Sequence, residues 1–252
     1  MSEGGLHGWV RSEFTAAGYT RDVYRRGSGP GVIVVHEIPG ITPKVIDFAN
    51  DVVAAGFTVM MPSLVGTPGR EVSGAYIASS MLKVCVAREF THWALDRTSP
   101  IIGWLRVLAS ELHDELGGPG VGAIGMCFSG GFALAMMVDE SVVAPVLSQP
   151  SLPFAVGKAA RGADLNLSAA DALAVAARAG AGCEVLGLRF TDDKLVGSRF
   201  DSLRELLGDA FIAVELPSKS KRDHSVLTEQ RDEPSVQQVI GFLQGKLKSE
   251  AS

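Results

Sequence analysis

The sequence predicts an α/β fold in which a mostly parallel, doubly wound central sheet carries helices on both faces. Short apolar runs without polar interruption recur along the chain, as expected of strands that are buried on both faces of a parallel sheet. Segments with helical periodicity alternate with these runs. We expect the central strands at residues 31–35, 57–61, 121–126, 142–147, 184–190 and 211–216.

An N-terminal β-hairpin is expected to precede the central strands. Polar and apolar residues alternate over about residues 8–26, and Ala16-Ala17-Gly18 interrupts the alternation as a turn would. Two more irregular stretches, about 63–98 and 150–182, are predicted to be excursions from the sheet, the second of them containing a helix. The whole chain, residues 1–252, is expected to form a single domain. The predicted helices lie at 44–55, 99–116, 132–138, 169–179, 198–207 and 234–247.

Composition favours a globular protein with a large core and does not favour a nucleic-acid-binding one. Hydrophobic residues make up 46% of the 252 residues and charged residues 20%, which argues against disorder. The net charge is -5, and the basic residues are scattered, so an electrostatic footprint for nucleic acid is not expected. The three cysteines, at 85, 127 and 183, form neither a disulfide framework nor a zinc pattern.

The ends and apolar runs of the chain predict a cytoplasmic location. The first residues lack the basic and apolar regions of a signal peptide. Apolar runs stay well below the ~18–20 residues that span a bilayer. We therefore expect a cytoplasmic protein with reduced thiols, without a cofactor or metal, and without nucleic-acid or membrane partners. It is expected to be a monomer or a small homo-oligomer.

The most informative motif is the segment Gly125-Met-Cys127-Phe-Ser129-Gly130-Gly, where an apolar strand passes directly into a helical pattern. A strand–nucleophile–helix elbow turns so tightly that the residues around the nucleophile must be small, and Gly125, Ser129 and Gly130 satisfy this requirement. The helix that follows presents free N–H groups, which stabilise a developing oxyanion. Cys127 is therefore the candidate nucleophile. A buried structural cysteine is the alternative interpretation.

Candidate acid and base residues follow later strands of the predicted sheet. In doubly wound sheets the functional residues gather at the carboxyl ends of the strands. Asp192 and Asp193 follow the strand at 184–190, and His224 lies between the last strand and the last helix. The order nucleophile, acid, histidine is that of α/β-hydrolases. In this interpretation Cys127 attacks a carbonyl group, His224 transfers protons, and an aspartate orients the imidazole.

Together these residues resemble the dienelactone hydrolase family over roughly residues 20–247. The motifs that carry the resemblance are the cysteine elbow, Glu37-Ile-Pro-Gly40, Asp193-Lys-Leu-Val196 and Asp-His224-Ser225. The resemblance implies an eight-stranded α/β-hydrolase sheet and the hydrolysis of cyclic enol-lactones and related esters. It also favours Asp193 over Asp192 as the acid, because the family has an Asp-x-x-Val spacing.

The resemblance implies further roles around the elbow. The backbone N–H groups of Ile38 and Phe128 are expected to form the oxyanion hole. Glu37 is expected to interact with the resting thiol and to take part in its activation, as in the family. His36, at the end of the first central strand, is a candidate for substrate contact, and Ser225 is retained beside the histidine.

The sequence also departs from the family in the residues that recognise substrate. The family's enol-lactone enzymes bind a substrate carboxylate through arginines, one of which stands four residues after the histidine, where this chain has Thr228. Arg88 is the candidate for the other arginine. Ser129 stands where the family often has glycine. We therefore expect a small-molecule lactone or carboxylic ester as substrate, rather than dienelactone specifically.

A different class of function is compatible with the same cysteine. A cysteine beside a helix N-terminus is also a site at which peroxide oxidation is favoured. The alternative to a hydrolase is therefore a redox-responsive or ligand-binding protein that retains the elbow without efficient turnover.

Overall fold

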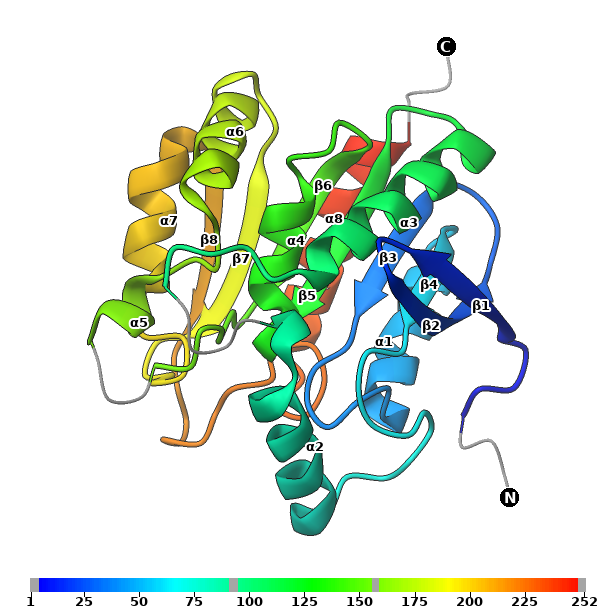
Figure 1. Cartoon of the computed structure of the whole chain (residues 1–252), viewed down its shortest axis with the longest axis horizontal. Coiled ribbons are helices and arrows are strands. Elements are labelled where there is room, and N and C mark those ends of the chain that lie inside the picture. The colour runs from blue at the N-terminus through cyan, green and yellow to red at the C-terminus, as the bar shows by residue number, and fades with distance from the viewer. Residues whose placement is uncertain (1–4, 91–94, 156–158, 249–252) are drawn as a thin grey trace.

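The computed structural model describes residues 5–90, 95–155 and 159–248. Within them lies an eight-stranded sheet with the order β1-β2-β4-β3-β5-β6-β7-β8 (Figure 1). β1 pairs with β2, and β2 with β4, in antiparallel fashion, and the remaining neighbours are parallel. The predicted α/β class with a mostly parallel sheet is confirmed. The strands are β1 (Val10–Ala16), β2 (Tyr19–Arg26), β3 (Gly31–Val35), β4 (Thr58–Pro62), β5 (Val121–Met126), β6 (Val142–Ser148), β7 (Val185–Phe190) and β8 (Phe211–Leu216).

Helices cover both faces of the sheet (Figure 1). Because side chains alternate along a strand, the uninterrupted apolar run of β3 supplies both faces: Val32 and Val34 pack into one core, and Ile33 and Val35 into the other. The first core also contains apolar residues of α1 (Pro43–Ala54) and α8 (Glu233–Leu247), and the second contains those of α3 (Ile101–Leu116), α4 (Gly130–Met136), α6 (Ala169–Gly180) and α7 (Arg199–Leu207).

The stretch 63–98 was expected to be irregular, but it contains the helix α2 (Gly74–Val86), followed by the short 3-10 helix η1 (Arg88–Phe90). The side chain of Ser73 caps α2 by accepting a hydrogen bond from Tyr76 N at 3.2 Å. Figure 1 shows α2 projecting beyond the end of the sheet, and most of its described residues are exposed. Tyr76, Ile77, Met81 and Val84 follow helical spacing, but Gly66, Pro68, Gly69 and Gly74 in the same stretch indicate turns, which explains why the stretch was predicted to be irregular.

A buried arginine fixes the second excursion against the loop that follows β7. Arg199 is fully buried, and burial lowers the pKa of its guanidinium to about 10. Its charge is compensated by hydrogen bonds to backbone carbonyl groups before, within and after the short helix α5 (Ala159–Ala163) and on the loop after β7. The acceptors are the carbonyl oxygens of Leu152, Pro153, Arg161, Asp164, Leu195 and Val196.

Among the described residues, no helix combines the length and apolar character that crossing a bilayer requires.

The carboxyl ends of the six central strands share one edge of the sheet, since all six run parallel. The segments after β3, β5, β6, β7 and β8 therefore meet at that edge.

Candidate active site

Cys127 stands at a strained turn where β5 ends and the 3-10 helix η2 (Cys127–Ser129) begins, and η2 leads into α4. Its φ of 55° lies in the left-handed region, which non-glycine residues adopt rarely and mostly where the surroundings enforce it. The close packing around the turn agrees with the predicted need for small residues. A Cβ atom at Gly125 would lie 2.1 Å from the carbonyl oxygen of Ser129, and one at Gly130 would lie 2.6 Å from Cα of Pro150.

Ser129 does more in the elbow than satisfy a size limit. It is fully buried, and its Oγ accepts a hydrogen bond from Met126 N at 2.9 Å. The same Oγ lies 3.0 Å from the carbonyl oxygens of Val35 and His36, to which its proton can be donated. Ser129 thereby ties the cysteine elbow to the end of β3, a role that its small size alone did not reveal.

The acid and the base predicted from the sequence are in direct contact. Nδ1 of His224 lies 2.6 Å from Oδ2 of Asp193, whose other oxygen accepts a hydrogen bond from Leu195 N at 3.0 Å. Asp193 is 7% exposed, whereas Asp192 is exposed and uses its backbone N–H to bind Ser218 Oγ. Of the two aspartates that the sequence left open, Asp193 is therefore the one that contacts the histidine.

The imidazole of His224 is placed to hold a proton. Burial disfavours its charged form, but Cys127 and the hydrogen bond to Asp193 outweigh burial and raise the pKa of His224 well above its ordinary value. Because Asp193 occupies Nδ1, the other ring nitrogen remains for exchange with the thiol and the substrate. Cys127 and His224 line the same cavity.

Glu37, on the loop after β3, is buried and is held by the segment that carries the histidine. Its Oε2 accepts a hydrogen bond from Ser225 Oγ at 2.7 Å, and its Oε1 accepts one from the hydroxyl of Thr228. Gln149 Nε2 lies 3.3 Å from Oε2. The resemblance implies an interaction of Glu37 with the resting thiol; in this structure the carboxyl group is hydrogen-bonded to Ser225 and Thr228, and Glu37 lines the same cavity as Cys127.

Gln149 was not among the predicted site residues. It follows β6, is fully buried, and has a φ of 36°. Its Oε1 accepts a hydrogen bond from Val226 N at 3.3 Å, so that the side chain connects Glu37 with the segment after His224. Its position in Ser148-Gln149-Pro150, at the carboxyl end of a predicted strand, was the available signal.

His36 supports the Glu37 loop from within the protein. It is fully buried, and burial lowers its pKa to about 4, so the ring is neutral. Its Nδ1 donates to the carbonyl oxygen of Glu37 at 2.8 Å, and its Nε2 accepts from Leu64 N at 3.0 Å. Since the backbone occupies both nitrogens, His36 is a buried support of this loop and not the substrate contact that was expected.

Three predicted residues remain to be placed. Ile38 lines the cavity together with Cys127, and Phe128 lies in the first turn of η2, where helix N–H groups have no intrahelical partner. Arg88 belongs to η1 at the end of α2, and its side chain lies outside the described part of the structure.

An eight-stranded sheet with a cysteine elbow and a following Asp–His pair agrees with the resemblance found in the sequence. The family model described as "Dienelactone hydrolase family" matches residues 17–233. The chain belongs to the dienelactone hydrolase family. The predicted family and the predicted hydrolase class are thereby confirmed. Among curated proteins, none matches the chain.

Solved structures of dienelactone hydrolases and esterases have the same fold. Dienelactone hydrolase from Anabaena variabilis superimposes with a TM-score of 0.63 at 14% identity, covering 95% of this chain and 98% of that one. A dienelactone hydrolase-like promiscuous phosphotriesterase from metagenomic libraries gives 0.60 at 16% identity, with coverages of 95% and 98%. A cold-adapted esterase from an Arctic intertidal metagenomic library gives 0.57 at 17% identity, with coverages of 94% and 93%.

The cavity beside the dienelactone hydrolase elbow has a volume of about 250 Å³. Part of its wall comes from the histidine loop, residues 217–232, which joins β8 to α8. The rest comes from the Glu37 loop, from α2 and the segment before it, and from the loop after β7. The lining residues are Glu37, Ile38, Pro39, Thr42, Val72, Ile77, Met81, Cys127, Leu195, Arg222, His224, Ser225, Glu229 and Gln230.

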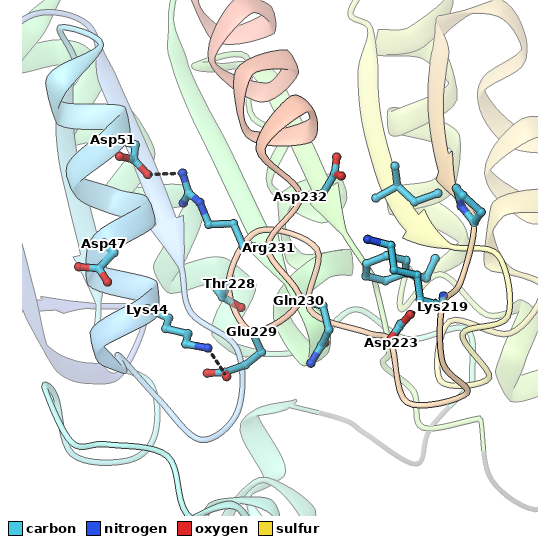
Figure 2. A pocket seen from close by; sticks show the side chains of 13 residues that line it. Lys44, Asp47, Asp51, Lys219, Asp223, Thr228, Glu229, Gln230, Arg231 and Asp232 are labelled. Atoms are coloured by element: carbon cyan, nitrogen blue, oxygen red, sulfur yellow. Dashed lines mark hydrogen bonds and ion pairs between the residues drawn. The ribbon is translucent and has the colours of Figure 1, made fainter.

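On its other side, the histidine loop borders a larger cavity of about 730 Å³ (Figure 2). Figure 2 shows two ion pairs that join this loop to α1: Lys44 lies 2.9 Å from Glu229, and Arg231 lies 2.9 Å from Asp51. These pairs are partly exposed, so each contributes on the order of 0–1 kcal/mol to stability.

Within the described residues, no cluster of three or more His, Cys, Asp or Glu side chains is arranged to bind a metal.

The buried carboxyl group of Glu37 makes the stability of this hydrolase depend on pH. Burial raises the pKa of Glu37, although the hydrogen bonds from Thr228 and Ser225 oppose this shift. The folded protein therefore holds the Glu37 proton more tightly than the unfolded chain. Its contribution to stability is fully present below the unfolded pKa of about 4.3 and is lost as the pH rises through the folded pKa.

Glu37→Gln, which does not titrate, should therefore gain stability relative to wild type as the pH rises. Urea unfolding of both proteins at about pH 4 and about pH 8 measures this difference. In Thr228→Val, Glu37 is retained but loses one of the hydrogen bonds that stabilise its carboxylate. The pKa of Glu37 should therefore rise further than in the wild type. A stability difference between Glu37→Gln and wild type that is equal at both pH values would show that Glu37 titrates normally.

Proposed function

We propose that this chain hydrolyses a lactone or small carboxylic ester through an acyl-enzyme formed on Cys127. The observation that carries the proposal is the 2.6 Å contact between His224 and Asp193, together with the cavity that His224 lines jointly with the cysteine on the strained elbow. A merely structural elbow has no need of a buried acid–histidine pair beside it. The fold and the family support hydrolysis, and the arrangement of these three side chains supports the mechanism.

In the acylation step, the thiol proton of Cys127 passes to the free ring nitrogen of His224, and the sulfur attacks the carbonyl carbon of the substrate. The carbonyl oxygen becomes an oxyanion, which the N–H groups of Ile38 and Phe128 bind. Each such donor is worth about 3–4 kcal/mol in the transition state. The C–O bond to the leaving group then breaks, and the proton on His224 moves to the departing alkoxide or enolate oxygen. The products of this step are a thioester and an alcohol or enol, which departs when the substrate is an ester and stays attached to the acyl group when it is a lactone.

In the deacylation step, a water molecule gives a proton to His224 as its oxygen attacks the thioester carbon. The same oxyanion hole holds the second tetrahedral intermediate. The C–S bond breaks, the carboxylic acid is released, and the proton returns from His224 to the sulfur. Asp193 keeps the imidazole oriented in both steps by accepting the hydrogen bond from Nδ1. Asp193 also stabilises the charged form of the ring.

The decisive experiment is to follow p-nitrophenyl acetate and a panel of small lactones with purified protein, and to record the intact mass during turnover. We expect hydrolysis together with an adduct of one acyl group that disappears when substrate is exhausted. Peptide mapping should locate the adduct on Cys127. A protein that hydrolyses no ester or lactone, but whose Cys127 forms a stable sulfenic acid with peroxide, would favour the redox alternative instead.

A further inference from the structure

Outside the histidine loop, the wall of the cavity beside Cys127 is largely apolar, and Glu37 and Thr42 are its polar members. Six apolar residues contribute to it, from three separate segments: the Glu37 loop, α2 with the segment before it, and the loop after β7. They are Ile38, Pro39, Val72, Ile77, Met81 and Leu195. In contrast, the histidine loop contributes the polar residues Arg222, Glu229 and Gln230 together with His224 and Ser225.

Several of these apolar side chains remain exposed to solvent at the mouth of the cavity. Val72 is 36% exposed, Ile77 is 39% exposed and Leu195 is 42% exposed. Grouped large hydrophobic side chains on a surface mark a place where an apolar ligand or partner binds, whereas single ones need no explanation. Here they surround the cavity that holds the nucleophile, so the ligand they indicate is the substrate.

The arrangement of α2 agrees with this interpretation. Ile77 and Met81 are four residues apart and so lie on one face of the helix, which is the face that lines the cavity. The next turn places Val84 in the protein core. Leu82, on the same helix, is 65% exposed and does not line the cavity. Ile77 and Met81 therefore line the cavity, and Met81 also packs against the core cluster that contains Val84.

The charged groups near the cavity do not form a site for a buried substrate carboxylate. Thr228, at the position of the family's arginine, uses its hydroxyl to bind Glu37. Glu229 is paired with Lys44, and Arg222 is exposed on the histidine loop. A carboxylate placed against Ile38, Ile77 and Met81 would lose its hydration without gaining a partner there, which is costly.

We infer that the cavity binds an uncharged, apolar acyl chain along Ile38, Ile77 and Met81, and that the leaving group faces the polar histidine loop. This inference rests on the proposed function, because it assigns the two sides of the ester relative to Cys127. The orientation of the ester follows from the position of the general acid as well as from the polarity of the wall. His224 must protonate the leaving group, so the leaving group lies on the side of the cavity formed by the loop that carries His224.

The test compares p-nitrophenyl acetate, butyrate and hexanoate, which share a leaving group and differ in acyl length. Burial of each methylene is expected to raise kcat/KM by about fourfold. p-Nitrophenyl hemisuccinate, which has the chain length of butyrate and ends in a carboxylate, should be turned over at least about tenfold more slowly than butyrate. A flat series, or a hemisuccinate that reacts faster than butyrate, would overturn the inference.

Matched variants on α2 connect the chain-length dependence to the cavity. Met81→Gln keeps the size of the side chain and makes it polar, and should reduce the ratio of hexanoate to acetate kcat/KM by about tenfold. Leu82→Gln makes the same kind of change on the face of α2 that does not line the cavity, and should leave the ratio unchanged. If both variants reduce the ratio equally, the effect belongs to the helix as a whole and the assignment is wrong.

Two further measurements distinguish a failure of this inference from a failure of the proposed function. Acetate hydrolysis that is lost in Cys127→Ala but shows no preference for longer acyl chains would reject only the acyl assignment. Alkyl acetates of increasing alcohol length test the opposite orientation, and a rate that rises with the alcohol instead of the acyl group would also reject it. Absence of any Cys127-dependent ester hydrolysis would reject the proposed function itself.

Discussion

Cys127→Ala is expected to lower kcat/KM for ester and lactone hydrolysis by about 10,000-fold or more. The variant retains the oxyanion hole and the His224–Asp193 pair, but it has no atom that can form the acyl-enzyme. The fold should survive, because alanine and cysteine meet the same steric restriction at a φ of 55°. The close contacts at Gly125 and Gly130 are also unchanged. Initial rates with p-nitrophenyl acetate, together with a melting curve for each protein, measure the two effects separately.

Cys183→Ala is the matched control for this variant. Cys183 is a free, half-buried cysteine just before β7, and its Sγ lies 3.7 Å from the carbonyl oxygen of Val143 at the start of β6. It therefore stands at the amino end of the parallel strands, opposite to Cys127. Removal of this thiol should leave hydrolysis unchanged. A folded Cys127→Ala protein as active as the wild type would make the elbow a structural turn and would exclude the acyl-enzyme.

The positions that meet at the site were predictable because parallel topology converts sequence order into spatial proximity. Cys127, Asp193 and His224 each follow a different strand, and strands that run parallel deliver their next residues to one edge of the sheet. The choice between Asp192 and Asp193 was less certain, since both follow β7 and carry the same group. It depends on which of the two side chains points inward, and there the structure buries Asp193 and exposes Asp192.

The residues that surround this set were not predictable in the same way. Gln149 and Thr228 meet Glu37 across 112 and 191 residues of sequence, and Ser129 binds the carbonyl of Val35 across 94 residues. A local pattern carries no information about such partners. For His36 the difference from the structure is of the opposite kind, because the residue was included in the predicted site. Its position at the end of a strand suggested a substrate contact. At such a position a side chain can equally be directed into the protein, where the backbone of Leu64 binds it.

Asp193→Asn is expected to reduce kcat by about 100- to 10,000-fold with little loss of stability. Oδ1 of Asp193 accepts a hydrogen bond from Leu195 N, and this bond should keep the amide oxygen of an asparagine at that position. The amide NH₂ group would then face Nδ1 of His224, which must accept instead of donate. The proton of the neutral ring is thereby moved to the nitrogen that should take the thiol proton from Cys127, so the ring is in the wrong tautomer for catalysis.

Asp192→Asn provides the control, because it makes the same chemical change one residue away on an exposed side chain. Asp192→Asn should leave kcat unchanged. Asp193→Asn should lower the pKa of His224 in addition to lowering kcat, because the charge and hydrogen bond of Asp193 are among the causes that raise this pKa. Nitrogen-15 NMR of the imidazole measures both the pKa and the tautomer. If Asp192→Asn were the inactive variant and Asp193→Asn kept the wild-type tautomer, the acid would be Asp192, and the loop after β7 would have to rearrange during turnover.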